Sequence, residues 1–281
     1  MSSILYKIAE ENAFELIDFR PLHGGDINAV FHLKTDIGDR VVKLNNALKF
    51  PNMFETEHKG LELLRMSNSF TVPKVFKNSN IGDTSYLLME FIHSSKKIEN
   101  FWEDFAFKLI KLHSCSRESF GLEFNNYIGN LNQINHSKKS SSEFYIESRL
   151  DPQFQMAIDC GFEFSNLNEF YNNISHEIPS EKSALIHGDL WNGNYMVSDR
   201  GEAVLIDPAV AFASREMDLA MMKLFGGFAD EVFEIYDENF PLIEGWKDRI
   251  EIWQLYYLLV HLNIFGKSYY PSVVRILDRY I

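Results

Sequence analysis

The pattern of apolar and polar residues changes near residue 92. Before it, short apolar runs and alternations are separated by polar turns, which is typical of β-strands. This pattern predicts strands over residues 14–19, 29–34, 40–44, 72–76 and 86–91. One helix is expected among them, over residues 51–66, where Phe54, Leu61 and Leu64 are spaced for a single buried face.

Beyond residue 92 the apolar residues recur every three or four positions, as in helices with one buried face. Helices are predicted over residues 98–113, 144–160, 167–174, 216–224, 230–239, 246–265 and 272–280. A short island has strand character at residues 184–186, 195–197 and 203–206. The sequence therefore predicts an α+β fold of two lobes that meet near residues 90–95. The first is a small antiparallel-sheet N-terminal lobe, residues 1–92, and the second is a larger, mostly helical C-terminal lobe, residues 93–281.

Composition narrows the classes of function. The chain has 281 residues, of which 46% are apolar and 24% charged, as in a folded protein with a hydrophobic core. A net charge of −13 argues against a nucleic-acid partner held by general phosphate attraction. Cys115 and Cys160 are too few for a disulfide framework. We expect a cytoplasmic protein without a membrane segment, because the N-terminal stretch lacks a signal-peptide pattern and the longest apolar run, residues 255–265, is too short for a bilayer.

The strongest chemical signal lies in the strand-like island. It is the segment His187-Gly188-Asp189-Leu190-Trp191-Asn192-Gly193-Asn194, followed beyond the next strands by Asp207. This order and spacing of aspartate, asparagine and aspartate is typical of a kinase catalytic loop. In that chemistry Asp189 accepts or orients the proton of the attacking hydroxyl, and oxygens of Asn194 and Asp207 hold Mg²⁺. The alternative is a surface turn whose side chains satisfy backbone donors.

A glycine-rich loop between two predicted strands offers a place for nucleotide phosphates. It contains Gly24, Gly25 and Asn28, and backbone N–H groups of such a loop can approach phosphate oxygens closely, although Gly-Gly is also common in plain turns. The last predicted strand runs into the connector between the lobes. There the main-chain groups of residues 90–92 (Glu90, Phe91 and Ile92) are expected to meet the adenine base of ATP.

Lys43, on the strand predicted over residues 40–44, is placed to reach the α- and β-phosphates. Such a lysine needs an acidic partner, and the next helix offers Glu55 and Glu57. Glu57 is favoured because it lies shortly before the apolar face of Leu61 and Leu64, while Glu55 stays open. The chain has no P-loop and no Rossmann glycine motif, so other nucleotide-binding folds lack support.

With these residues in place, the sequence resembles the fructosamine kinase (ketosamine 3-kinase) family, within the wider aminoglycoside-phosphotransferase-like, protein-kinase-like fold. The resemblance runs nearly the length of the chain. Its markers include the catalytic-loop segment with its Trp191 and, elsewhere, Gly24-Gly25-Asp26-Ile27-Asn28, Val42-Lys43-Leu44-Asn45, Asn126-Tyr127-Ile128-Gly129, Arg149-Leu150, Asp207-Pro208-Ala209-Val210 and Phe225-Gly226-Gly227-Phe228. The resemblance implies ATP- and Mg²⁺-dependent phosphorylation of a sugar hydroxyl on a ketoamine, the adduct of a sugar with an amine, and a role in deglycation.

Contacts with the acceptor substrate are expected from Trp191, Asn126 and Arg149. Trp191 either stacks on the sugar or packs under the loop. Arg215 and Asp218 are expected to pair with backbone or with the catalytic loop. A kinase of another small acceptor, such as an aminoglycoside or choline, would carry the same donor-side residues, and a nucleotide-binding pseudoenzyme is a third hypothesis. The oligomeric state and the glycated amine stay open.

Gly188 stands where protein kinases have a basic residue, and Pro208 follows Asp207 in place of a phenylalanine. Regulation by phosphorylation of an activation loop is therefore not expected.

Overall fold

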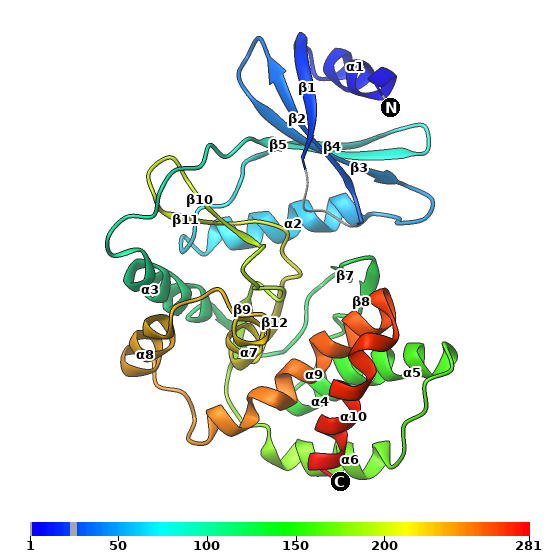
Figure 1. Ribbon diagram of the computed structural model, residues 1–281, viewed down its shortest axis with the longest axis vertical. Helices are drawn as coiled ribbons and strands as arrows, with labels where there is room; N and C mark the ends of the chain where they lie inside the picture. Colours follow the sequence, from blue (N-terminus) through cyan, green and yellow to red (C-terminus); the bar gives the residue numbers. More distant parts are fainter. Residues whose placement is uncertain (1, 23–26) are drawn as a thin grey trace.

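The computed structural model describes residues 2–22 and 27–281. The N-terminal part is a five-stranded antiparallel sheet with strand order β1-β2-β3-β5-β4 and with helices α1 and α2 packed against it (Figure 1). Its elements are α1 (Ser2–Glu11), β1 (Leu16–Leu22), β2 (Ala29–Thr35), β3 (Arg40–Asn46), α2 (Met53–Met66), β4 (Val75–Ile81) and β5 (Thr84–Glu90).

The alternation of side chains along β3 decides which residue faces which helix. Val42 and Leu44 are buried with Leu5 and Ile8 of α1. Lys43 therefore points to the opposite face of the sheet, where α2 lies. The predicted apolar face of α2 is buried on that side, together with residues of β5.

The C-terminal part is mostly helical, and α9 forms its centre. Its helices are α3 (Phe101–His113), α4 (Ser141–Tyr145), a π-helical turn (Ile146–Leu150), α5 (Asp151–Asp159), α6 (Leu167–Glu177), α7 (Glu216–Leu224), α8 (Asp230–Asn239), α9 (Trp246–Phe265), a 3₁₀ turn (Lys267–Tyr269) and α10 (Tyr270–Arg279). Residues 255–260 of α9 are all buried and hydrophobic, as expected of a helix segment in the core of a lobe.

Three small sheets lie between the main sheet and these helices (Figure 1). Their strands are β6 (Ser116–Arg117), β7 (Asn126–Ile128), β8 (Leu131–Gln133), β9 (Ser183–Ile186), β10 (Tyr195–Val197), β11 (Ala203–Leu205) and β12 (Ala211–Ala213). Hydrogen bonds tie them to the N-terminal part: the N–H of Leu205 donates to the carbonyl of Thr71 at 3.0 Å, and the hydroxyl of Tyr127 donates to the carbonyl of Pro51 at 3.0 Å.

The predicted α+β architecture, with a sheet-based N-terminal lobe and a helical C-terminal lobe, is confirmed. The predicted helical character of residues 144–160 is confirmed, although it is divided into α4, a π-helical turn and α5. Pro152, in the first turn of α5, has no N–H to continue the hydrogen-bond ladder of a preceding helix. Cys115 and Cys160 are free thiols. Within the described residues, no helix is both long enough and apolar enough to cross a bilayer.

Candidate active site

A buried carboxylate holds the loop between β9 and β10. Asp218 of α7 accepts hydrogen bonds from the backbone N–H groups of His187, at 2.7 Å, and Gly188, at 2.8 Å. The imidazole of His187 donates from Nε2 to the carbonyl of Ile206 at 3.0 Å, and Nδ1 accepts from the N–H of Asp189 at 3.3 Å. Burial lowers the pKa of His187, so the ring holds the loop in its neutral form. The predicted pairing of Asp218 with the catalytic loop is confirmed.

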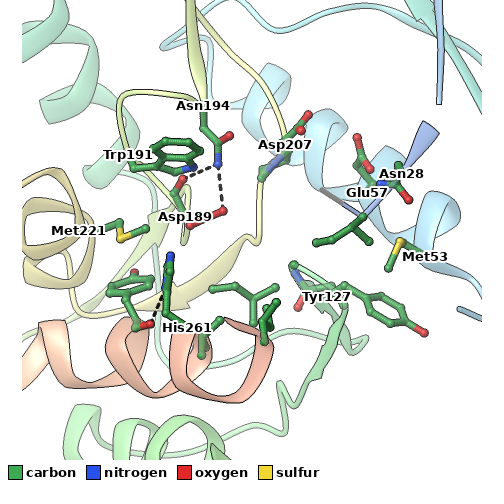
Figure 2. Close-up of a pocket in the computed structure, with 18 of the residues that line it drawn as sticks. Asn28, Met53, Glu57, Tyr127, Asp189, Trp191, Asn194, Asp207, Met221 and His261 are labelled. Atoms are coloured by element: carbon green, nitrogen blue, oxygen red, sulfur yellow. Dashed lines mark hydrogen bonds between the residues drawn. The ribbon is translucent and has the colours of Figure 1, made fainter. Parts of the chain in front are cut away.

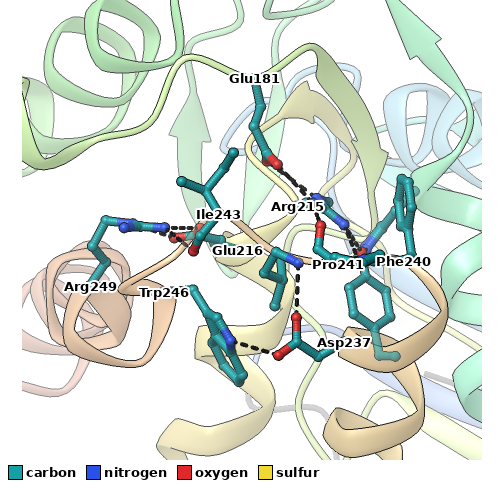
Figure 3. Close-up of polar contacts among 12 residues, drawn as sticks. Glu181, Arg215, Glu216, Asp237, Phe240, Pro241, Ile243, Trp246 and Arg249 are labelled. Carbon is teal, nitrogen blue, oxygen red and sulfur yellow. Dashed lines mark hydrogen bonds and ion pairs between the residues drawn. The ribbon is translucent and has the colours of Figure 1, made fainter.

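Arg215, directly before α7, is anchored on the chain that follows α8 (Figure 3). Its guanidinium donates to the carbonyls of Phe240, at 2.7 Å, and Pro241, at 2.6 Å, and pairs with Glu181 at 2.7 Å. Pairing with backbone was one of the two roles predicted for it. These contacts fix the start of α7 and thereby the position of Asp218.

Gly188 is required by a close approach of two backbone segments. Its φ is 81°, in the left-handed region, and a Cβ at this position would lie 2.1 Å from the carbonyl oxygen of Ala209. No side chain fits there, which explains why the basic residue of protein kinases is missing at this position.

Asp189 and Asn194 face each other across the loop. The side-chain amide of Asn194 donates to the Asp189 carbonyl at 2.8 Å and to its carboxylate at 3.0 Å, which leaves Asn194 Oδ1 available as a ligand (Figure 2). Burial, with smaller contributions from the charges of Asp207 and Asp218, raises the pKa of Asp189 from 3.8 to about 7, although the bond from Asn194 opposes the shift. Asp189 is therefore poised to take up a proton near neutral pH.

Lys43 joins the two lobes. Its ammonium lies 2.7 Å from Glu57 Oε1 of α2 and 2.5 Å from Asp207 Oδ1, and its side chain is only 7% exposed. Burial alone would lower the pKa of Lys43, but the charges of Asp207 and Glu57 outweigh it and raise the pKa above its usual value. Glu55 pairs instead with Lys59 on the surface of α2. Of the two partners left open by the sequence, the structure selects Glu57.

Asp207 has a φ of 56°, which is costly for a residue with a side chain and is typical of functional sites. Carboxylate and amide oxygens are suitable ligands for Mg²⁺, so Asp207 and Asn194 fit the predicted role. Within the described ranges, no group of three or more His, Cys, Asp and Glu side chains is arranged to hold a metal ion. Protein sites for Mg²⁺ that use one or two side chains are commonly completed by substrate phosphates and water.

The predicted residues converge on a cavity of about 620 Å³ between the main sheet and the helical lobe (Figure 2). Eight of them line it: Asn28, Lys43, Glu57, Asn126, Asp189, Trp191, Asn194 and Asp207. Gly24 and Gly25 lie outside the described residues.

The opposite wall of the cavity was missed by sequence reasoning. It is mainly apolar and aromatic and consists of Met221, Phe225, Tyr257, Val260, His261, Ile264, Phe265 and Tyr269. Burial lowers the pKa of His261 and favours the neutral ring. Its Nδ1–H donates to the carbonyl of Tyr257 at 2.7 Å, so Nε2 of the neutral ring carries no proton. Most of these residues belong to α7 and α9, and in the sequence they cannot be told apart from the residues of a helix core.

Trp191 has both of the surroundings predicted for it. Its indole lies over Gly193, where a Cβ would meet the ring at 2.4 Å, and it packs edge-on against Phe225 with ring centroids 6.4 Å apart. It also lines the cavity beside Asp189 (Figure 2). Packing on the loop and contact with a sugar are therefore compatible.

Arg149 does not reach the cavity, so its predicted contact with substrate is wrong. Its side chain is buried, and the guanidinium donates to the carbonyl of Ile134 at 2.5 Å and to Asn135 Oδ1 at 2.7 Å. The amide of Asn126 is also engaged: it donates to the carbonyl of Val210 at 2.9 Å and its oxygen accepts from neighbouring side-chain amides. Asn126 therefore supports the cavity floor.

The connector after β5, which was expected to meet the adenine base of ATP, makes contacts of its own. The N–H of Glu90 donates to the carbonyl of Lys74 at 2.9 Å, and its carboxylate accepts from the Lys74 N–H at 3.1 Å. The ring of Phe91 packs on His32 at 4.2 Å. Glu90, Phe91 and Ile92 are not among the residues that line the cavity.

A sheet that presents a paired lysine to two aspartates of a helical lobe defines the class: a kinase-like phosphotransferase. Known structures agree on the fold. The spectinomycin phosphotransferase APH(9)-Ia superposes with a TM-score of 0.63 at 13% identity, covering 99% of this chain and 93% of that one.

The whole described chain also matches one family. The family model for fructosamine kinase matches residues 2–281, and the chain belongs to this family of ATP-dependent kinases. A crystal structure from Haemophilus somnus described as a fructosamine-3-kinase has a TM-score of 0.90 at 28% identity, covering 99% of this chain and 96% of that one. A protein from Enterococcus faecium described as a probable ketoamine kinase is 36% identical over 92% of this chain and 94% of its own length. The protein-ribulosamine 3-kinase of Arabidopsis thaliana is 32% identical over 98% of this chain and 86% of its own length.

Proposed function

We propose that the protein transfers the γ-phosphoryl group of ATP to the sugar 3-hydroxyl of a ketoamine, with Asp189 as the base. Membership of the fructosamine kinase family and the names of its relatives, such as the protein-ribulosamine 3-kinase of Arabidopsis thaliana, support the substrate class. The observation that carries the chemistry is the position of Asp189 in a cavity that also holds Asn194, Asp207 and Lys43.

Each side chain has a role that follows from its surroundings. Asp189 accepts the proton of the attacking hydroxyl, since its raised pKa lets it bind a proton near pH 7. Lys43, kept charged by Glu57 and Asp207, binds the phosphates. Mg²⁺, held by Asn194 and Asp207 when bound, would neutralise phosphate charge as the reaction proceeds. The aromatic wall excludes water from the acceptor side and suits the apolar face of a sugar.

Release of ADP tests this function. We expect turnover with fructosyl-lysine and ribulosyl-lysine, and loss of turnover in D189N with ATP binding retained. Preference for an aminoglycoside or choline would replace the ketoamine assignment with another small acceptor. ATP binding without ADP release on any acceptor would favour a nucleotide-binding pseudoenzyme. We infer a cytoplasmic location and no nucleic-acid partner from the sequence alone.

A further inference from the structure

Five tyrosines of this protein are among its largest fully buried side chains: Tyr86, Tyr145, Tyr236, Tyr256 and Tyr257. Four of their hydroxyls have hydrogen-bond partners in the protein, as buried polar groups normally do. Among the residues that the structure describes, the hydroxyl of Tyr257 has none. It is the exception that needs a physical reason.

The position of Tyr257 supplies that reason. The residue is 0% exposed, yet it lines the same cavity as Asp189 and Trp191. Its neighbour Tyr256, which is equally buried, donates its hydroxyl to Gln133 Oε1 at 2.7 Å and does not line the cavity. Two adjacent tyrosines on α9 therefore differ: the hydroxyl of Tyr256 is hydrogen-bonded inside the protein, whereas Tyr257, which lines the cavity with the candidate base, has a hydroxyl without a partner among the described residues.

The chemistry of the hydroxyl limits what it can bind. Burial raises the pKa of Tyr257 well above the usual value, and the negative charges of Asp218 and Asp189 add to this, so the group stays protonated. A protonated tyrosine offers one donor and acceptor lone pairs. A neutral hydroxyl, which both donates and accepts, matches it, whereas an anionic phosphate would be repelled by the two nearby carboxylates.

We propose that the Tyr257 hydroxyl is an acceptor-binding group that forms its hydrogen bond with a hydroxyl of the ketoamine sugar other than the one phosphorylated. This inference rests on the proposed function. It makes Tyr257 a determinant of sugar specificity, because a substrate lacking that hydroxyl would leave the buried tyrosine unpaired.

The test compares Y257F with the matched control Y256F, since each removes one hydroxyl and keeps the ring. In the ligand-free protein, Y257F should leave the melting temperature unchanged or raise it, because no bond is lost, while Y256F should lower it. In steady-state kinetics, Y257F should raise KM for the ketoamine about tenfold with kcat and KM for ATP nearly unchanged. A set of deoxy ketoamines completes the test, each lacking one sugar hydroxyl other than the one that is phosphorylated. With the analogue that lacks the partner of Tyr257, wild type and Y257F should have the same KM.

Three results would overturn the inference. Y257F could melt lower than wild type with unaltered kinetics, which would mean that the hydroxyl is satisfied by an ordered water in the free protein. Its KM for the ketoamine could equal that of wild type. Its KM could rise equally on every deoxy analogue, so that no single hydroxyl is its partner. If wild type itself releases no ADP with any ketoamine, the proposed function fails before the variants are compared.

Discussion

The ammonium of Lys43 lies 2.5 Å from Asp207 Oδ1, so one ion pair links the N-terminal sheet to the turn after β11. Lys43 also binds Glu57, and therefore a single cation sits between two carboxylates from two lobes. In the proposed reaction Asp207 would also serve as a metal ligand. In that reaction the ion pair would place the lysine proposed to bind phosphate beside the aspartate proposed to bind Mg²⁺.

Removing this lysine should affect transition-state stabilisation strongly. We expect K43A to lower kcat/KM by about 10²–10³-fold, because a charge on the transferring phosphate loses its partner. K59A is the control, since Lys59 pairs with Glu55 on the exposed side of α2, the helix that also carries Glu57. An exposed pair of this kind contributes little, so K59A should keep kcat/KM within about twofold of wild type. Equal kinetics for K43A and wild type would show that Lys43 is misassigned.

The raised pKa of Asp189 predicts the pH dependence of the reaction. As pH rises through about 7 the carboxylate form becomes populated, so kcat/KM should rise with a midpoint near pH 7 and level off at higher pH, where Asp189 is fully ionised. Asn194 opposes the shift through its hydrogen bond, so N194A should move the inflection to higher pH while also raising the Mg²⁺ concentration needed for half-maximal rate. A profile that stays flat from pH 5 to 9 would exclude Asp189 as the base.

The same group makes a prediction about stability. Folding raises the pKa of Asp189 from 3.8 to about 7, so in this window the folded state holds a proton that the unfolded state has released, and stability falls as pH rises. D189N removes the buried ionisable group. Its melting temperature should exceed that of wild type by about 3 °C or more at pH 8, and the difference should shrink towards pH 4. D199N, at an exposed turn, should show no such trend, and a pH-independent difference for D189N would contradict the burial of charge at this position.

Two glycine variants separate the effect of close backbone packing at Gly188 from the effect of its positive φ. G188A should unfold the catalytic loop and abolish turnover, because the added methyl would meet the Ala209 carbonyl at 2.1 Å. G82A is the matched control: Gly82 also has positive φ, at 60°, but nothing lies within 4 Å of its missing Cβ. It should cost only about 1 kcal/mol of unfolding free energy, measured by denaturant titration, and keep full activity. Normal activity in G188A would refute the close packing of this loop.

The sequence predicted the candidate site best where its residues lie close together along the chain. Asp189, Asn194 and Asp207 lie within one strand–loop–strand unit, so their order alone predicts that they meet. Glu57 could be preferred over Glu55 because the apolar face of α2 reveals which side turns towards the sheet.

The apolar and aromatic wall of the cavity could not be predicted in the same way. His261 and Phe225 come from segments far apart in the chain, and aromatic residues on helices read as ordinary core. The substrate contact predicted for Arg149 was wrong for a related reason. Arginine is rarely buried, and only the fold reveals the carbonyl and amide oxygens that accept its hydrogen bonds. The unpaired Tyr257 hydroxyl is visible only once every neighbour has been placed.

Phosphorus NMR of the reaction product is the most direct test of the central claim. Wild-type protein incubated with ATP, Mg²⁺ and fructosyl-lysine should yield ADP and a phosphate monoester coupled to the proton on carbon 3 of the sugar, and D189N should yield neither above background. A phosphate on another position, inorganic phosphate in place of a sugar ester, or equal product from D189N would contradict the account.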